Sequence, residues 1–403
     1  MKRFVLTSLL ATSITFNLTG CNSTSNASAV FIPLSEETKS LGIEDVPDTL
    51  SETYSVEMKF NRYTKVLAPN GKAIHLIAQD KLSDNQIVRA RSVLEHYLTP
   101  LPNSQFGSDK TQVANKMADN NAVLLLLNGE DDGSNPASDL GGQPLYQNEI
   151  QVEGHKWYTT QDYDHRDATF EEILHLVHDY GIGVDQEDTF MGALPEFQAE
   201  IRQAQYYALA HRLWGGGIDQ RNWIKELTEE NSLSQEYLAS VIDSYYGLWG
   251  AWSESNTHGM WGIYTAKSRK EIALEDTLGA ELMNNKFFHS YLTYNARIDE
   301  SFTGDFSLRF NESVPYTHHS QYLKNITLTG SNPSNVIVNS MDNDITGNEA
   351  TNKVFFSGNA SAYTIEKHSD GSVTVKDKQQ RIDGKNHLSH IEKLVFKDKT
   401  ITL

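Results

Sequence analysis

Apolar and polar positions alternate in short blocks along the first third of the chain, and each block predicts one element. Residues 55–63 and 72–79 alternate with a period of two, which indicates strands. Ser83 and Asp84 then begin a segment with helical spacing that ends before Pro100. The apolar positions of this expected helix are Ile87, Ala90, Val93, Leu94, Tyr97 and Leu98.

A second helix is expected around residues 111–118. The apolar run 122–127 follows it and suits a central strand that is buried on both faces. Residues 130–142 are rich in Gly, Asp and Ser and indicate a loop, and residues 149–158 indicate a further strand. The next expected helix begins near Thr169.

The remainder of the chain is first helical and then rich in strands. Helical spacing covers residues 196–214, 234–248 and 268–284. The expected fold class is therefore α+β. It comprises a mixed α/β lobe over residues 46–180, a mainly helical lobe over 181–322, and an all-β module over 323–403.

The side chains that can carry chemistry gather in the expected helix after Thr169. Glu171, His175 and His178 are spaced i, i+4 and i+7, so they share one helical face, and Glu172 lies beside it. Borderline-soft divalent ions bind His nitrogen and carboxylate oxygen. The spacing therefore predicts a metal site on this helix.

The run Glu171-Glu172-x-x-His175 resembles the H-E-x-x-H motif of the thermolysin-type zinc peptidases, the gluzincins, with Glu in place of the first His. Residues 192–200 (GALPEFQAE) are similar to the G-A-x-N-E-x-x-x-D segment of that family. The resemblance implies a zincin-like α/β lobe, built from a mixed sheet and the motif helix.

The resemblance also implies roles for individual residues. His175 and Glu196 would bind zinc, Glu172 would be the general base, and Glu200 would support the ligands from behind. Glu171 stands where the family has a His ligand, so either Glu171 or His178 would complete the set.

A gluzincin also needs a donor for the oxyanion that forms beside the metal. His258 and Tyr264, in a segment rich in glycine and aromatic residues, are the candidates in this sequence, and His211 and Arg212 are weaker alternatives.

A helix without chemistry explains part of the same pattern. Thr169-x-x-Glu172 has the form of a capping box, and the helix dipole favours acids in a first turn. His175 and His178 would then be buried structural residues. This alternative predicts no metal.

The amino terminus carries a separate signal. A basic pair precedes the apolar run 4–16, which is too short to span a bilayer. Residues 18–21 (LTGC) resemble a bacterial lipoprotein box, which implies cleavage before Cys21 and attachment of lipid to it. The residue after Cys21 implies sorting to the outer membrane of a Gram-negative cell. Residues 22–45 would form a flexible tether.

Composition limits the partners. The 403 residues suit two or three domains, and with a single cysteine the chain forms no internal disulfide. The net charge of −19 argues against nucleic acid as a partner and is compatible with cation binding. The expected partners are therefore a peptide or protein substrate, and the membrane through the lipid on Cys21.

The all-β module has a repeat. Asn335, Asp344 and Lys353 lie nine residues apart, which is the period of the calcium-binding nonapeptide β-roll. Most glycines of that repeat are missing, so a full row of Ca²⁺ is not expected, and one weak site near Asp342 and Asp344 is the remaining candidate. Residues 356–398 resemble the β module that follows such repeats in secreted bacterial proteases and surface proteins.

Three functions stay open. The first is a membrane-anchored zinc peptidase, in which Glu172 would take a proton from water at the metal and return it to the leaving amine. The second is a surface binding or adhesion lipoprotein with a degenerate peptidase fold and no catalysis. The third is a metal-dependent reaction other than proteolysis, at a Glu-rich site that holds iron or manganese.

Overall fold

A computed structural model describes residues 33–184, 192–217, 220–253, 263–379 and 381–403. Cys21 and His258 lie outside the described residues. Within the described part of the chain, no helix has both the length and the apolar character needed to cross a membrane. The protein is a mixed α/β chain with several sheets and a strand-rich C-terminal region.

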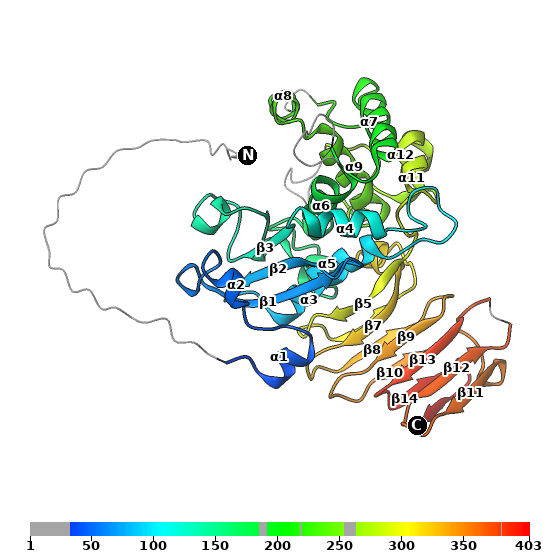
Figure 1. Ribbon diagram of the computed structural model, residues 1–403. Helices are drawn as coiled ribbons and strands as arrows, with labels where there is room; N and C mark the ends of the chain where they lie inside the picture. Colours follow the sequence, from blue (N-terminus) through cyan, green and yellow to red (C-terminus); the bar gives the residue numbers. More distant parts are fainter. Residues whose placement is uncertain (1–32, 185–191, 218–219, 254–262, 380) are drawn as a thin grey trace, which may run out of the picture.

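A four-stranded sheet organises the N-terminal part of the chain (Figure 1). The strand order is β1-β2-β3-β4; β1 is antiparallel to β2, and β2, β3 and β4 run parallel. All five residues of β3 are buried, as the apolar run predicted. The bounds are β1 (Phe60–Leu67), β2 (Ala73–Gln79), β3 (Val123–Leu127) and β4 (Gln143–Tyr146).

Two helices connect β2 to β3, and both were predicted from their spacing. They are α3 (Asp84–Leu98) and α4 (Thr111–Asp119). The Ser83 hydroxyl accepts from the Gln86 backbone N–H at 3.2 Å, and the Gln86 side chain accepts from the Ser83 N–H at 3.0 Å. This capping box begins α3 where the sequence indicated. The short N-terminal elements are α1 (Glu36–Ser40), α2 (Asp48–Ser51) and η1 (Val56–Met58).

The strand expected over residues 149–158 is not formed, and that prediction is wrong. Gly154 has a φ of +90°, which turns the chain, and His155 then caps a short helix through its ring nitrogen. A left-handed residue followed by a helix cap is incompatible with a continuous strand. The elements in this region are η2 (Pro136–Asp139), η3 (Gln147–Glu149) and α5 (Lys156–Thr159).

The helix α6 (Thr169–Val177) lies at the centre of the molecule (Figure 1). It packs against α3 and β4 on one side and against α9 on the other. A π-helical turn, η4 (His178–Ile182), continues it. The surrounding helices are α7 (Pro195–Ala210), α8 (Arg221–Glu230), α9 (Leu233–Tyr245), α11 (Arg269–Glu275) and α12 (Thr277–Met283).

The C-terminal region is a two-sheet coil. The chain alternates between a six-stranded sheet, of order β11-β12-β13-β9-β7-β5, and a five-stranded sheet, of order β15-β14-β10-β8-β6. The expected start of the β module at residue 323 therefore falls after its first two strands. The bounds are β5 (Leu292–Ile298), β6 (Gly304–Ser307), α13 (Thr317–Ser320), β7 (Leu323–Leu328), β8 (Ser334–Ile337), β9 (Asn343–Thr346), β10 (Lys353–Phe355), η5 (Ala360–Ala362), β11 (Tyr363–Lys367), β12 (Val373–Asp377), β13 (Lys385–Ser389), β14 (Lys393–Val395) and β15 (Thr400–Thr402).

The nine-residue period places successive repeats on β8, β9 and β10, in alternating sheets. Their buried apolar residues are Val336, Ile345 and Val354. Asparagine amides connect neighbouring turns of the coil: Asn343 Nδ2 donates to the Lys324 carbonyl at 2.9 Å, and Asn352 Nδ2 to the Ser334 carbonyl at 2.7 Å. These bonds bridge the turns where the sequence lacks glycines.

The calcium candidates lie on the outside of this coil. Asp342 and Asp344 are exposed, and Asp342 Oδ1 accepts from the Lys385 backbone N–H at 2.8 Å. Neither belongs to a group of three converging His, Cys, Asp or Glu side chains among the described residues. A weak Ca²⁺ site here stays a prediction.

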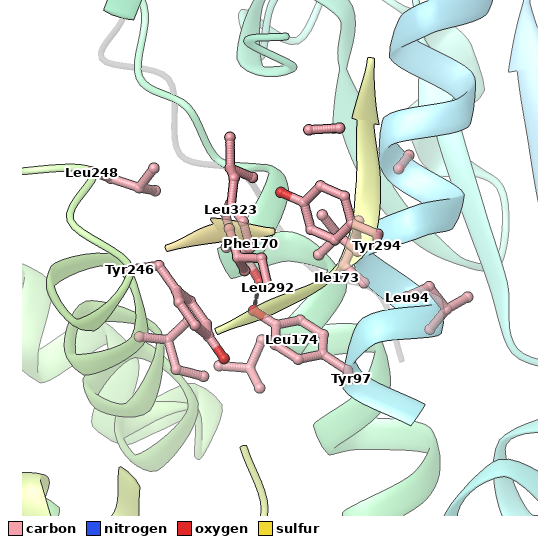
Figure 2. Packing of buried hydrophobic residues seen from close by; sticks show 14 of the residues in the cluster. Leu94, Tyr97, Phe170, Ile173, Leu174, Tyr246, Leu248, Leu292, Tyr294 and Leu323 are labelled. Carbon is pink, nitrogen blue, oxygen red and sulfur yellow. Dashed lines mark hydrogen bonds between the residues drawn. The ribbon is translucent and has the colours of Figure 1, made fainter. Parts of the chain in front are cut away.

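The larger of two apolar clusters in the described part of the chain joins the N-terminal sheet, the helices and the two-sheet coil. Figure 2 shows side chains of α3, α6, β5 and β7 and of the segment after α9 in a single cluster. Within it the Tyr97 hydroxyl donates to the Phe170 carbonyl at 2.9 Å. The two-sheet coil is therefore packed on the helices and not suspended from them.

A buried charge network, which we call the Arg89 network, runs through this core. Arg89 of α3 contacts Asp167 at 2.8 Å and Glu153 at 3.2 Å, and the side chains of all three are at most 2% exposed. Tyr158 and Tyr294 donate to the carboxylates of Asp167 and Glu153 at 2.5 and 2.7 Å. The network thus ties α3, the start of α6 and the strand β5 to one guanidinium group.

We expect Arg89→Met to lower the free energy of unfolding by about 3–5 kcal/mol, because it leaves two buried carboxylates without a cation. Arg91→Met is the matched control on the same helix. Its ion-pair partner Glu95 is half exposed, so the expected loss is about 1 kcal/mol. Urea denaturation of both variants checks this. Equal losses would contradict the central role of the Arg89 network.

A second prediction concerns Lys110, whose side chain is 1% exposed. Its Nζ donates to the Tyr97 carbonyl at 2.8 Å and lies 4.1 Å from the centroid of the Phe287 ring. Burial lowers the pKa of Lys110 from 10.5 to about 7. Between these two values the unfolded chain holds a proton that the folded protein has released.

This difference makes the folded protein gain stability from Lys110 as the pH rises above about 7, up to about 10. The gain should be missing in Lys110→Met. Denaturation of wild type and variant at about pH 6 and about pH 9 measures it, because other titrating groups cancel in the comparison. An identical pH dependence in both proteins would show that Lys110 stays protonated in the fold.

Candidate metal centre

Three side chains from α6 and α9 converge in the middle of the molecule. Glu171 and His175 of α6 and Glu236 of α9 each offer one ligand atom, and these atoms all lie within 4.8 Å of one another. His175 Nε2 is 3.7 Å from Glu236 Oε1. We call these three residues the triad; two of them were singled out from the sequence, and Glu236 was not.

Glu172 lies beside the triad, where the sequence placed it. Its Oε2 accepts from Gln143 Nε2 of β4 at 2.5 Å and is 3.6 Å from His175 Nδ1. Its Oε1 accepts from the guanidinium group of Arg166 at 3.3 Å. The carboxylate is therefore held by β4 on one side and by the residues before α6 on the other.

Arg166 contacts three of the carboxylates in and beside the triad. Its Nη1 donates to Glu171 Oε2 at 2.6 Å, and its Nε lies 3.7 Å from Glu149 Oε1. The side chain is 40% exposed, compared with 11% for Glu171 and 6% for His175. It is thus the site's main contact with solvent among these residues.

Carboxylates outnumber cations around the triad. Glu149, Glu171, Glu172, Glu236 and Asp243 lie close enough to influence one another, and among the described residues their cationic partners are Arg166 and His175. Such a group is costly to bury because each charge loses hydration.

The pKa values of these groups reflect the cost of burying charge. Burial, reinforced by neighbouring carboxylates, raises the pKa of both Glu149 and Glu236 to about 7. Burial also raises the pKa of Asp243, again with help from Glu171. For His175 burial acts downward, but the charges of Glu236, Glu172 and Glu171 outweigh it and raise the pKa to about 9. The site as a whole attracts positive charge.

His178 does not join the triad. The α-helix ends at Val177, and His178 begins the π-helical turn, where its Nε2 lies 2.5 Å from Gln198 Oε1 of α7. Gln198 Nε2 in turn donates to the Ser234 hydroxyl at 3.0 Å, two residues before Glu236. Burial lowers the pKa of His178 to about 4, so it stays neutral. Its role in this structure is to link α6, α7 and α9.

The residues taken from the second half of the family resemblance lie elsewhere. Glu196 is exposed at the start of α7, because the apolar residues Phe197 and Ile201 define the buried face of that helix. Glu200 pairs with Lys286 at 2.5 Å. The structure therefore does not bring Glu196 or Glu200 to the triad, and Glu236 occupies the place expected for Glu196.

A signal for Glu236 exists in the sequence. The helix α9 contains two acids, Glu236 and Asp243, and no Lys or Arg. They are seven residues apart and so share a face of a helix that is otherwise apolar or small. Two acids on one face of a buried helix that has no Lys or Arg indicate a partner cation from elsewhere in the fold.

Two further expectations fail for local reasons. The helix α6 begins at Thr169 without a capping box, and the Asp167 carboxylate accepts from the Thr169 N–H at 3.1 Å instead.

The candidate oxyanion donors lie away from the triad or outside the described residues. Tyr264 is fully buried and donates to Asp276 at 2.9 Å, and His211 stacks on Tyr207 at the surface. Of the candidate oxyanion donors, His258 is outside the described residues.

The triad fits a divalent ion. His175 Nε2 is buried and has no hydrogen-bond partner, although an imidazole nitrogen in a protein interior is normally bonded. Zinc binds both His nitrogen and carboxylate oxygen, and a catalytic site with three protein ligands leaves a fourth position for water or substrate. Manganese and iron accept the same atoms.

Comparison of the sequence with models of known protein families and with curated proteins found no match. The function of the protein is therefore inferred from the geometry of the site.

We expect Glu236→Ala to weaken zinc binding by more than about 100-fold, since even residues that only support a ligand contribute 10- to 100-fold. Glu196→Ala is the matched control, because that residue is exposed on α7. Calorimetry and elemental analysis measure affinity and stoichiometry. Loss of zinc in Glu196→Ala, with retention in Glu236→Ala, would reverse the assignment.

Proposed function

We propose that this protein is a metal-dependent hydrolase of peptide bonds, with Glu171, His175 and Glu236 as ligands of a zinc ion or a similar divalent ion. The observation that carries the proposal is the convergence of these three side chains with an unpartnered buried imidazole nitrogen, next to a further carboxylate. The surplus of buried acids supports a resident cation.

When bound, the ion would act as a Lewis acid that polarises the scissile carbonyl and makes water more acidic. The protein would do the rest. Glu172, held by Gln143 and Arg166, would accept the proton of the attacking water and pass it to the leaving amine. Its fixed orientation beside His175 suits this transfer.

The architecture supports the same reading. The motif helix α6 packs against β3 and β4 of a mixed sheet, and the third proposed ligand comes from a later helix. We propose on this basis that the N-terminal part is a zincin-like lobe, related to the gluzincins, in which Glu171 replaces a histidine.

The amino-terminal sequence supports an outer-membrane lipoprotein. We propose that Cys21 carries a lipid and that the residues between it and α1 connect it to the folded part; the expected tether of residues 22–45 was too long, because Ile43 is buried and Glu44 pairs with Tyr63. The substrate would then be a peptide or protein met at the membrane surface.

A non-catalytic surface protein is the second candidate, and one contact favours it. Arg166 already pairs with Glu171 at 2.6 Å, so a charge network without metal also satisfies one triad member. In that case zinc would not bind, and replacing Glu172 would have no chemical consequence.

We expect Glu172→Gln to lower kcat for peptide hydrolysis by about 10²- to 10⁴-fold, the usual contribution of a general base. Zinc content should be unchanged because Glu172 is not a member of the triad. Glu200→Gln serves as the control, since Glu200 pairs with Lys286 away from the triad. Cleavage of a mixed peptide library, read by mass spectrometry, checks the prediction. Full activity in Glu172→Gln would refute this mechanism.

A further inference from the structure

Arg166 has more hydrogen-bonding capacity than the site uses. A guanidinium group carries five N–H donors in a rigid planar fork. Nη1 donates to Glu171 and Nη2 donates to Glu172, at 2.6 and 3.3 Å. Donors of both terminal nitrogens therefore remain for another acceptor.

The position of Arg166 matches its spare capacity. Its side chain is 40% exposed, whereas Glu172 and Glu236 are 14% and 20% exposed. Of these side chains, Arg166 is therefore the most accessible to a molecule in solvent. Glu171 and Glu172 hold the guanidinium group of Arg166 in place.

Peptide hydrolysis needs such a donor. Attack of water converts the flat carbonyl group into a tetrahedral centre whose oxygen carries a negative charge, and fixed donors beside that oxygen lower the barrier. Among the described candidates, Tyr264 is bonded to Asp276 in the core and His211 stacks on Tyr207 at the surface. Arg166 is the described cation that contacts both a triad member and Glu172.

We propose that Arg166 is a catalytic residue that donates to the oxyanion of the tetrahedral intermediate. This inference rests on the proposed hydrolysis. Glu171 and Glu172 orient the guanidinium group, and its remaining N–H groups bind the negative oxygen. Orientation by two carboxylates means that little rearrangement is needed when the charge develops.

A substrate carboxylate presents the same chemistry as an oxyanion, since both are negatively charged oxygens that accept from a guanidinium group. The two sources separate experimentally. A carboxylate at the C-terminus is present in the ground state, so its loss would raise KM and would matter only for free peptides. The oxyanion exists only during reaction, so its loss lowers kcat for free and amidated peptides alike.

The test compares wild type, Arg166→Gln, Arg166→Lys and the control Arg91→Gln, all saturated with zinc. For one peptide with a free and an amidated C-terminus, we expect Arg166→Gln to lower kcat about 10²- to 10³-fold in both forms, with KM little changed. Arg166→Lys should recover part of the rate, because it keeps the charge without the fork. Arg91→Gln should behave as wild type.

A binding measurement makes the result independent of turnover. A peptide phosphonate, whose tetrahedral anion imitates the intermediate, should bind the zinc-loaded Arg166→Gln protein about 10²- to 10³-fold more weakly than wild type. Equal binding by the two proteins, or an effect confined to KM and to free peptides, would overturn the assignment.

The same experiment separates this inference from the proposed function. Phosphonate binding that depends on Arg166, without any peptide cleavage by wild type, would support the anion site and refute peptide hydrolysis. Cleavage that depends on Glu172 but not on Arg166 would support hydrolysis and refute the role of Arg166.

Discussion

The fold depends on a single buried guanidinium group. Arg89 needs carboxylate partners because it is removed from water, and the two carboxylates that it contacts lie 64 and 78 residues further along the chain. Glu153 also accepts from Tyr294 of β5, while Asp167 caps the first residue of α6. The same network therefore fixes the two-sheet coil, the sheet lobe and the start of α6 relative to one another.

The positions of the triad side chains depend on this arrangement. Asp167 sets where α6 begins, so Glu171 and His175, one turn apart, face α9 and not the sheet. The link from His178 through Gln198 to Ser234 holds α9 at the other end of α6 and places Glu236 opposite His175. A site carried by two helices that are clamped at both ends is well suited to hold ligand atoms at fixed separations.

Local sequence signals predicted the secondary-structure elements well. They failed for the orientation of side chains, which depends on how the elements pack. The capping box at Ser83, the apolar run of β3 and the nine-residue period of the coil each act over a few residues, and the structure confirms the elements. Glu196 was expected as a ligand because it matches a motif, but the rotation of α7 follows Phe197 and Ile201 and turns it outward. Glu236 carries a local signal, as an acid in a helix without Lys or Arg, but its position opposite His175 follows only from the contact between α6 and α9.

The contrast between the two charge networks bears most directly on function. In the Arg89 network one guanidinium group contacts two carboxylates, and each carboxylate also accepts from a tyrosine hydroxyl. Around the triad, five carboxylates lie near Arg166 and His175, the buried His175 Nε2 has no hydrogen-bond partner, and the Arg166 side chain is 40% exposed. The surplus of buried carboxylates is therefore larger around the triad, and a buried cluster with surplus charge is a candidate functional site. A divalent ion and a negatively charged reaction intermediate are together the simplest complement of that charge pattern.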